Sequence, residues 1–135
     1  MQQFAARFGI HDMKHPNMLP NTRRALAMAE FAGDQGHLDE FRRRTMDAHW
    51  KEAKNIEDDT ILMILAGASG LDPEKALIAA YDPVYLSRVD TIRIEYNKLG
   101  ASGIPTFIFD NEQVEGCQPY EVLADAALRA GAKQK

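Results

Sequence analysis

Residue types that carry redox chemistry are scarce in this chain of 135 residues. Cys117 is its single cysteine, so one copy cannot form an internal disulfide, a Cys-x-x-Cys redox pair or a thiolate-rich metal site. Thiol–disulfide exchange needs an attacking thiolate with a lowered pKa and a second thiol beside it. The sequence therefore contains no complete redox couple.

The histidines and carboxylates form no metal or acid–base motif. His11 and His15 flank Asp12 at a spacing of four, but Pro16 disfavours helical geometry at His15 and no third ligand follows at metal-binding spacing. The acidic run that ends at Asp59 is typical of a helix N-terminus, where the macrodipole favours negative charge. No glycine-rich phosphate loop or Ser/His/Asp arrangement is present, so we expect neither a metal nor a cofactor.

Composition argues against several classes of partner. The chain has 45% hydrophobic and 27% charged residues, which fits one globular domain, and its net charge of -4 argues against nucleic acid. Its one basic cluster, Arg42 to Arg44, is flanked by Glu40 and Asp47 at the spacing of helical ion pairs. No window approaches the ~20 apolar residues that span a bilayer, and the N-terminus lacks a signal-peptide core. We therefore expect a cytoplasmic protein with no membrane partner.

Helical signals fill most of the chain. Apolar residues recur at helical spacing between capping or breaking residues such as Asn21, Gly33 and the pairs Asp72-Pro73 and Asp82-Pro83. These signals predict helices over residues 22–32, 38–50, 61–66, 73–81 and 83–99, after a loop over residues 10–20. The last of these helices carries a recurring apolar set: Val84, Leu86, Val89, Ile92, Ile94, Tyr96 and Leu99.

The pattern changes after Gly103. A β-branched and aromatic run over residues 106–109, a turn at Asp110-Asn111 and a return strand over residues 113–115 predict a hairpin. A lone hairpin is marginally stable and its outer strand leaves backbone groups unpaired, so we expect another copy or an upstream segment to complete the sheet. A final helix begins near Gln118-Pro119, and its predicted core residues are Val122, Leu123, Ala126, Ala127 and Ala130.

The stretch from Leu99 to Asp110, LGASGIPTFIFD, and the later Gly116-Cys117-Gln118-Pro119 resemble the C-terminal motif of DsbA-like disulfide oxidoreductases of the thioredoxin superfamily. Upstream, the segment LPNTRRA from Leu19, the Ala-Glu-Phe-Ala that follows it and Gly70-Leu71-Asp72 are similar to the helical insertion of the FrnE-type branch. The resemblance implies a helix-rich α/β chain with an incomplete thioredoxin-like fold. A DsbA-type helical region would occupy residues 1–100, and a β-hairpin and C-terminal helix would occupy residues 101–135.

The resemblance also implies a substrate-binding site. In that family the proline at the position of Pro105 follows a cis peptide bond. The backbone of the residue before it, here Ile104, can hold an extended chain by strand-like hydrogen bonds. The expected substrate-binding residues are therefore Gly103, Ile104, Pro105 and Thr106, and the expected substrate is a polypeptide.

The N-terminal half of a thioredoxin fold does not carry over from the resemblance: the first strand, the Cys-x-x-Cys turn and the following strand are missing. Cys117 stands where the family more often has a small residue such as alanine. We therefore expect Cys117 to be a small buried hydrophobic residue, with an exposed redox-sensitive thiol or an intermolecular disulfide as the alternatives.

Three functions remain open at this point. The first is membership of the DsbA-like thiol–disulfide oxidoreductases as a fragment or redox-inactive form, which leaves open whether the chain alone is an enzyme. The second is a peptide-binding or dimerising module that uses the cis-proline loop and the open sheet edge, with a homodimer or an upstream half as partner. The third is a relative of kappa-type glutathione transferases and 2-hydroxychromene-2-carboxylate isomerases, which would bind glutathione.

Overall fold

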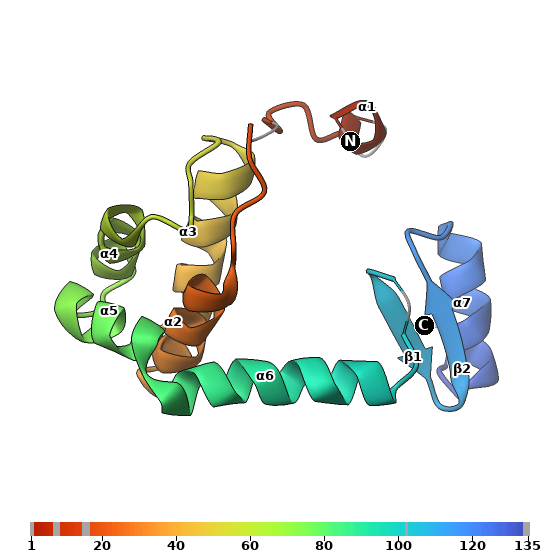
Figure 1. Cartoon of the computed structure of the whole chain (residues 1–135). Helices are drawn as coiled ribbons and strands as arrows, with labels where there is room; N and C mark the ends of the chain where they lie inside the picture. The colour runs from red at the N-terminus through yellow and green to blue at the C-terminus, as the bar shows by residue number, and fades with distance from the viewer. Residues whose placement is uncertain (1, 7–8, 15–16, 102, 134–135) are drawn as a thin grey trace. The chain divides into compact units, whose positions relative to one another are not determined.

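The computed structural model describes residues 2–6, 9–14, 17–101 and 103–133 (Figure 1). The chain divides into two compact units, Met1–Thr91 and Ile92–Lys135. The first contains α1 (Gln2–Ala6), α2 (Arg23–Asp34), α3 (Leu38–Trp50), α4 (Asp59–Ala68) and α5 (Pro73–Tyr81). The second contains β1 (Thr106–Phe109), β2 (Glu112–Glu115) and α7 (Tyr120–Arg129), and α6 (Pro83–Lys98) crosses the division.

The core of the first unit lies among α2, α3, α4 and α5. Helix α2 packs against α3 and α5, and α4 also packs against both. The largest fully buried side chains are Met28 on α2, Phe41 on α3 and Leu62 on α4. Each belongs to an apolar stripe at helical spacing, so one face of each helix is removed from water.

Side-chain caps fix the starts of α4 and α5. The Asp58 carboxylate accepts hydrogen bonds from the amides of Thr60 and Ile61 at 2.8 and 3.1 Å. The Asp72 carboxylate accepts from the amides of the second and third residues of α5 at 3.0 and 3.1 Å. Pro73 is the first residue of α5, so the predicted N-terminal signature of this helix is confirmed.

The bounds and one face residue of α2 differ from the prediction. Asn21 accepts a hydrogen bond from the Arg23 amide at 3.0 Å, and the helix begins at Arg23 and runs to Asp34. The apolar spacing predicted a core face of Ala25, Leu26, Met28, Ala29 and Ala32. All of these are buried except Leu26, which is 49% exposed, and Ala27 is buried as well.

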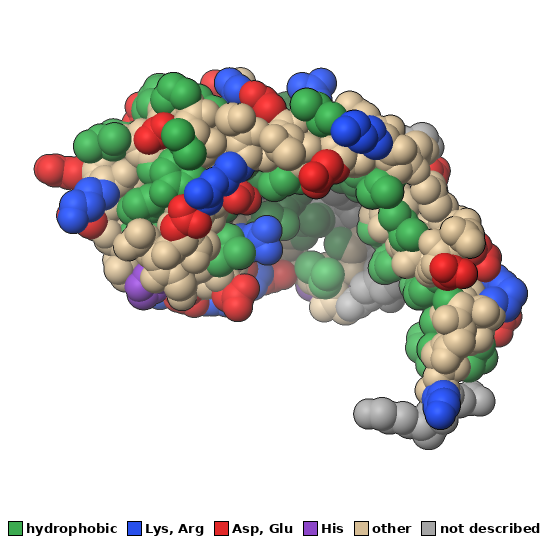
Figure 2. Space-filling model, turned by 90° about the horizontal axis from the view of Figure 1, so that it is seen from below, with side chains coloured by type: hydrophobic (Ala, Val, Ile, Leu, Met, Phe, Trp, Pro, Cys, Tyr) green, Lys and Arg blue, Asp and Glu red, His purple; other side chains and the backbone are tan. Residues whose placement is uncertain are grey.

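Helix α6 has no buried residue among those described, so its predicted apolar set does not form a core face. Polar and aromatic contacts attach it to α2. Arg88 donates to Asp34 at 2.9 Å, and the Tyr85 hydroxyl donates to the same carboxylate at 3.0 Å. Arg23 on α2 pairs with Asp90 at 2.6 Å. Exposed apolar side chains therefore remain among charged ones on the molecular surface (Figure 2).

The second unit is a hairpin covered by one helix. Strands β1 and β2 are antiparallel, with Phe107 opposite Val114, and α7 packs on β2. Val114 and Ala126 are buried, but Val122 and Ala130, which we expected in the core, are exposed. A two-stranded sheet offers α7 only a narrow apolar strip, so the rest of the helix stays open. Within the described ranges, no helix is both long and apolar enough to cross a membrane.

Candidate functional site

The predicted substrate-binding residues form the loop between α6 and β1. The Ile104–Pro105 peptide bond is cis, as the resemblance implied. Ile104 is 86% exposed, and Pro105 is exposed beside it. An apolar side chain this open to water is available to contact another chain.

Three hydrogen bonds hold the loop in place. The Gly103 carbonyl accepts from the Tyr96 hydroxyl at 2.8 Å and from the Thr106 hydroxyl at 2.6 Å. The Pro105 carbonyl accepts from the Gly116 amide at 2.7 Å, which ties the loop to the end of β2. Sequence reasoning placed Tyr96 on an apolar helix face and missed this role, because the spacing of a tyrosine does not show what its hydroxyl binds.

Cys117 lies next to this loop because Gly116, its neighbour, is bonded to Pro105. The thiol is exposed, so the expectation of a buried cysteine is wrong. Gly116 has a φ of +80°, and the Gln118 amide donates to the Gly116 carbonyl at 3.0 Å. This turn carries the chain away from the sheet before α7 begins, which leaves Cys117 outside the strip that α7 covers.

The outer edge of β1 is open within the part of the chain that the structure describes, because the sheet there has only β1 and β2. Bonded and non-bonded pairs alternate in an antiparallel ladder. Since Pro105 is bonded to Gly116, the backbone groups of Thr106 and Ile108 point away from β2. These N–H and C=O groups form a short row beside the exposed Ile104.

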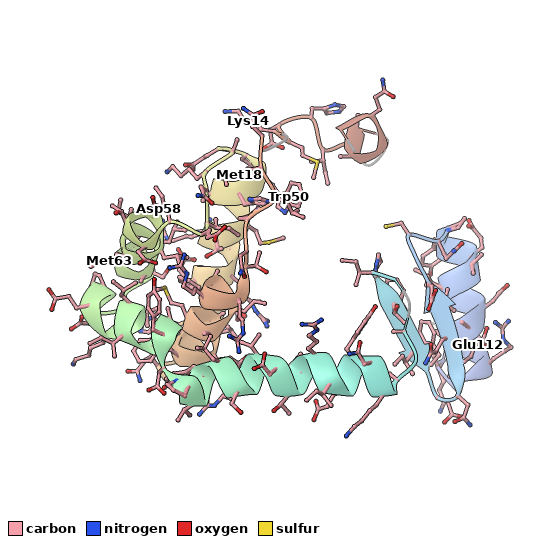
Figure 3. The ribbon with its side chains drawn as sticks, viewed as in Figure 1. Lys14, Met18, Trp50, Asp58, Met63 and Glu112 are labelled. Carbon is pink, nitrogen blue, oxygen red and sulfur yellow. The ribbon has the colours of Figure 1, made fainter. Side chains whose placement is uncertain are left out.

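The loop has no ionisable side chain, so it can bind a chain but cannot transfer a proton. At the turn end of the hairpin, Glu112 of β2 (labelled in Figure 3) pairs with Arg129 of α7 at 2.6 Å. The Arg129 guanidinium donates to this carboxylate and lowers the pKa of Glu112 below its usual value. This ion pair holds α7 on the hairpin. The loop residues themselves carry no charge.

The other candidate sites belong to the first unit. Arg43 pairs with Glu40 at 2.7 Å and with Asp47 at 3.4 Å, which confirms the basic cluster as a solvated face with ion pairs. Among the described residues, no three His, Cys, Asp or Glu side chains lie close enough to hold a metal ion. His15, one of the two histidines considered above, falls outside the described residues.

Comparisons with known proteins agree with this arrangement. The family model of the DSBA-like thioredoxin domain matches residues 1–127. The structure is similar to the crystal structure of a probable DsbA oxidoreductase from Streptomyces coelicolor, with a TM-score of 0.81 and 25% sequence identity. The similarity covers 99% of this chain and 58% of that one, so the chain spans little more than half of that protein. No curated protein matches the sequence.

Proposed function

Because the chain belongs to the DSBA-like thioredoxin family, we propose that it supplies the substrate-binding part of a DsbA-like thiol–disulfide oxidoreductase. The observation that carries the proposal is the exposed Ile104 beside the open edge of β1. With one cysteine in the sequence, a cysteine pair for exchange must come from another polypeptide segment.

In this proposal the substrate is an extended polypeptide that lies along β1. Its backbone pairs with the outward N–H and C=O groups of Thr106 and Ile108, as in strand addition to a sheet edge. The exposed Ile104 side chain contacts an apolar residue of the substrate. Backbone pairing accepts many sequences, which suits an enzyme that acts on unrelated proteins.

Within the family, we assign the chain to the FrnE-type branch. We further propose that its partner is either an upstream half of the same domain or a second copy of the chain. The support is the residue resemblance in α2 and before α5, together with the open edge of β1. A strand from either partner would compete with the substrate for the outer groups of Thr106 and Ile108. With the edge occupied in this way, the exposed Ile104 would remain to hold the substrate. The hairpin would then become part of a larger sheet.

Peptide binding can be tested by NMR on the ¹⁵N-labelled full chain. The probe is an extended apolar peptide with serine in place of cysteine, so that no disulfide can form. We expect the largest amide shifts at Thr106 and Ile108. Ile108→Pro removes an outward N–H from this edge and should weaken binding. Gln113→Pro, on the opposite strand edge, should bind like Gln113→Ala, which loses the same side-chain bond to the Leu99 carbonyl at 2.5 Å.

Melting curves of the three variants establish that each still folds. Equal peptide affinity of wild type and Ile108→Pro would contradict the proposal. Amide shifts confined to the first unit would contradict it as well. The same titration with glutathione separates this function from that of a kappa-type transferase relative, which would bind glutathione.

The missing redox couple gives a second test. In an insulin-reduction assay with dithiothreitol, the chain should not increase the rate above background. With one cysteine it cannot cycle between a dithiol and an internal disulfide, which would carry electrons from dithiothreitol to insulin. Cys117→Ser should behave identically. Catalysis by wild type that Cys117→Ser abolishes would instead assign redox chemistry to Cys117.

A further inference from the structure

The helical unit contains a small cavity at the C-terminal end of α3, outside the loop discussed above. Residues 17–20 cross this end of the helix, and the Lys14 amide donates to the Trp50 carbonyl at 2.6 Å, which holds the crossing segment in place (Figure 3). The cavity volume is about 160 Å³. An apolar cavity of about 150 Å³ is known to hold a benzene molecule, so this one has room for a small organic ligand. Its walls include Asn17, Met18, Pro20, His49, Lys54 and Asn55.

The His49 side chain is the buried polar group of this cavity. It is 8% exposed, and its Nδ1 is buried without a hydrogen-bond partner. Either ring nitrogen of an imidazole can carry a proton and donate a hydrogen bond. A carboxylate in the cavity that His49 lines would therefore supply the partner that Nδ1 lacks.

Two other polar walls, Asn55 and Lys54, can donate. Asn55 accepts a hydrogen bond from the Glu57 amide at 3.1 Å through its side-chain oxygen, so its NH₂ group remains to donate. Lys54 pairs with Glu52 at 2.5 Å, but both side chains are exposed, and such pairs are weak enough to exchange partners. Among the described residues that line the cavity there is no Asp or Glu. A ligand here meets the donors of His49, Lys54 and Asn55 and apolar carbon from Met18 and Pro20.

We propose that this cavity binds a small monocarboxylate, up to the size of benzoate. The carboxylate accepts hydrogen bonds from His49 and Asn55 with Lys54 as its counter-ion, and the apolar body of the ligand contacts Met18 and Pro20. Charge-assisted hydrogen bonds of this kind are about twice as strong as neutral ones, which favours a carboxylate over an alcohol or an amide. The cavity belongs to the first unit and the peptide-binding loop to the second, and this proposal does not depend on the proposed function.

The test is a titration of the ¹⁵N-labelled full chain with sodium benzoate, with benzyl alcohol as a neutral probe of similar size. We expect saturable shifts at the Asn55 NH₂ and the His49 ring, and much weaker binding of benzyl alcohol. Asn55→Asp keeps an oxygen for the Glu57 amide but replaces the donor with a negative charge. It should weaken benzoate binding about tenfold or more, since one hydrogen bond to a charged group is lost.

The matched control is Asn97→Asp, which adds the same charge on the exposed surface of α6 and should leave benzoate affinity unchanged. Melting curves establish that Asn55→Asp still folds, and His49→Phe, which keeps a ring but loses the donor, tests the site a second way. Equal affinity for benzoate and benzyl alcohol would overturn the proposal, as would unchanged binding in both site variants. Absence of saturable shifts at the cavity would overturn it as well.

Discussion

At the scale of single residues, Gly70 is the position that tolerates a side chain least. Its φ is +85°, and a Cβ built there would lie 3.0 Å from Cε1 of His37. Left-handed backbone costs a non-glycine residue about 1–2 kcal/mol, and the contact with His37 adds to this cost. We expect Gly70→Ala to lower the free energy of unfolding by more than the backbone term alone, as measured by urea denaturation.

Gly36 provides the matched control for this prediction. Its φ is +76°, but a Cβ there would meet nothing within 4 Å. Gly36→Ala should therefore show only the backbone cost. If the two variants lose equal stability, the contact between Gly70 and His37 has no energetic role.

The residue scale also shows how far sequence reasoning reaches into the candidate site. The motif around Pro105 predicted the cis peptide bond, because a run of specific residue types at fixed spacing identifies the loop. It did not predict the exposure of Cys117, which depends on how little of the hairpin α7 covers. It also missed the bond from Tyr96 to the Gly103 carbonyl, since hydrogen-bond partners across a loop leave no periodic signal.

At the scale of elements, α5 depends on the cap at its first turn. Asp72→Ala removes the acceptor of two backbone amides and should lower the free energy of unfolding by about 1 kcal/mol. Asp39→Ala is a suitable comparison, because Asp39 lies in the first turn of α3 without a capping bond and contributes only through the helix dipole. Thermal denaturation of the two variants should show the larger loss for Asp72→Ala, and the reverse order would contradict the capping role.

The attachment of α6 to α2 should depend on pH. Hydrogen bonds to the Asp34 carboxylate lower its pKa, and the bond from Arg88 has a larger effect than the bond from Tyr85. Because the folded-state pKa of Asp34 is below its unfolded value, the attachment contributes stability at neutral pH, and this contribution is lost as the pH falls through the folded-state pKa. Between neutral and strongly acidic pH, wild type should lose more stability than Asp34→Asn in urea denaturation.

Asp39→Asn serves as the control for that pH series, because Asp39 is exposed and has no ion pair among the described residues. Its loss of stability between neutral and acidic pH should be close to that of wild type, smaller only by the weak helix-dipole contribution of Asp39. If Asp34→Asn also follows wild type, the contacts of Asp34 with α6 do not contribute to folding.

The elements divide into those that local sequence determines and those that tertiary contacts determine. The bounds predicted for α3 and α5 agree with the structure. The Asp72-Pro73 pair fixes the start of α5, and apolar residues at helical spacing mark the extent of α3. The apolar residues of α6 led to a wrong prediction of a core face. Apolar residues at helical spacing predict such a face whether or not another element covers it. The apolar period of a helix does not show which other element packs against it.

At the scale of the whole molecule, the open edge of β1 predicts self-association. If a second copy completes the sheet, sedimentation should show a dimer, and Ile108→Pro should shift it toward the monomer by removing an edge donor. Gln113→Pro, on the other strand, should leave the dimer intact. A wild-type chain that sediments as a monomer at every concentration would leave the upstream half as the partner.

The position of the unit division within α6 has a consequence for handling the protein. The division falls between Thr91 and Ile92, in a helix with no buried residue among those described, and Arg93 follows within the same turn. Helices without buried contacts open locally more often than core helices, and proteases cut such segments first. Brief digestion with trypsin should therefore cleave α6 near Arg93 and release two lasting fragments that correspond to the two compact units.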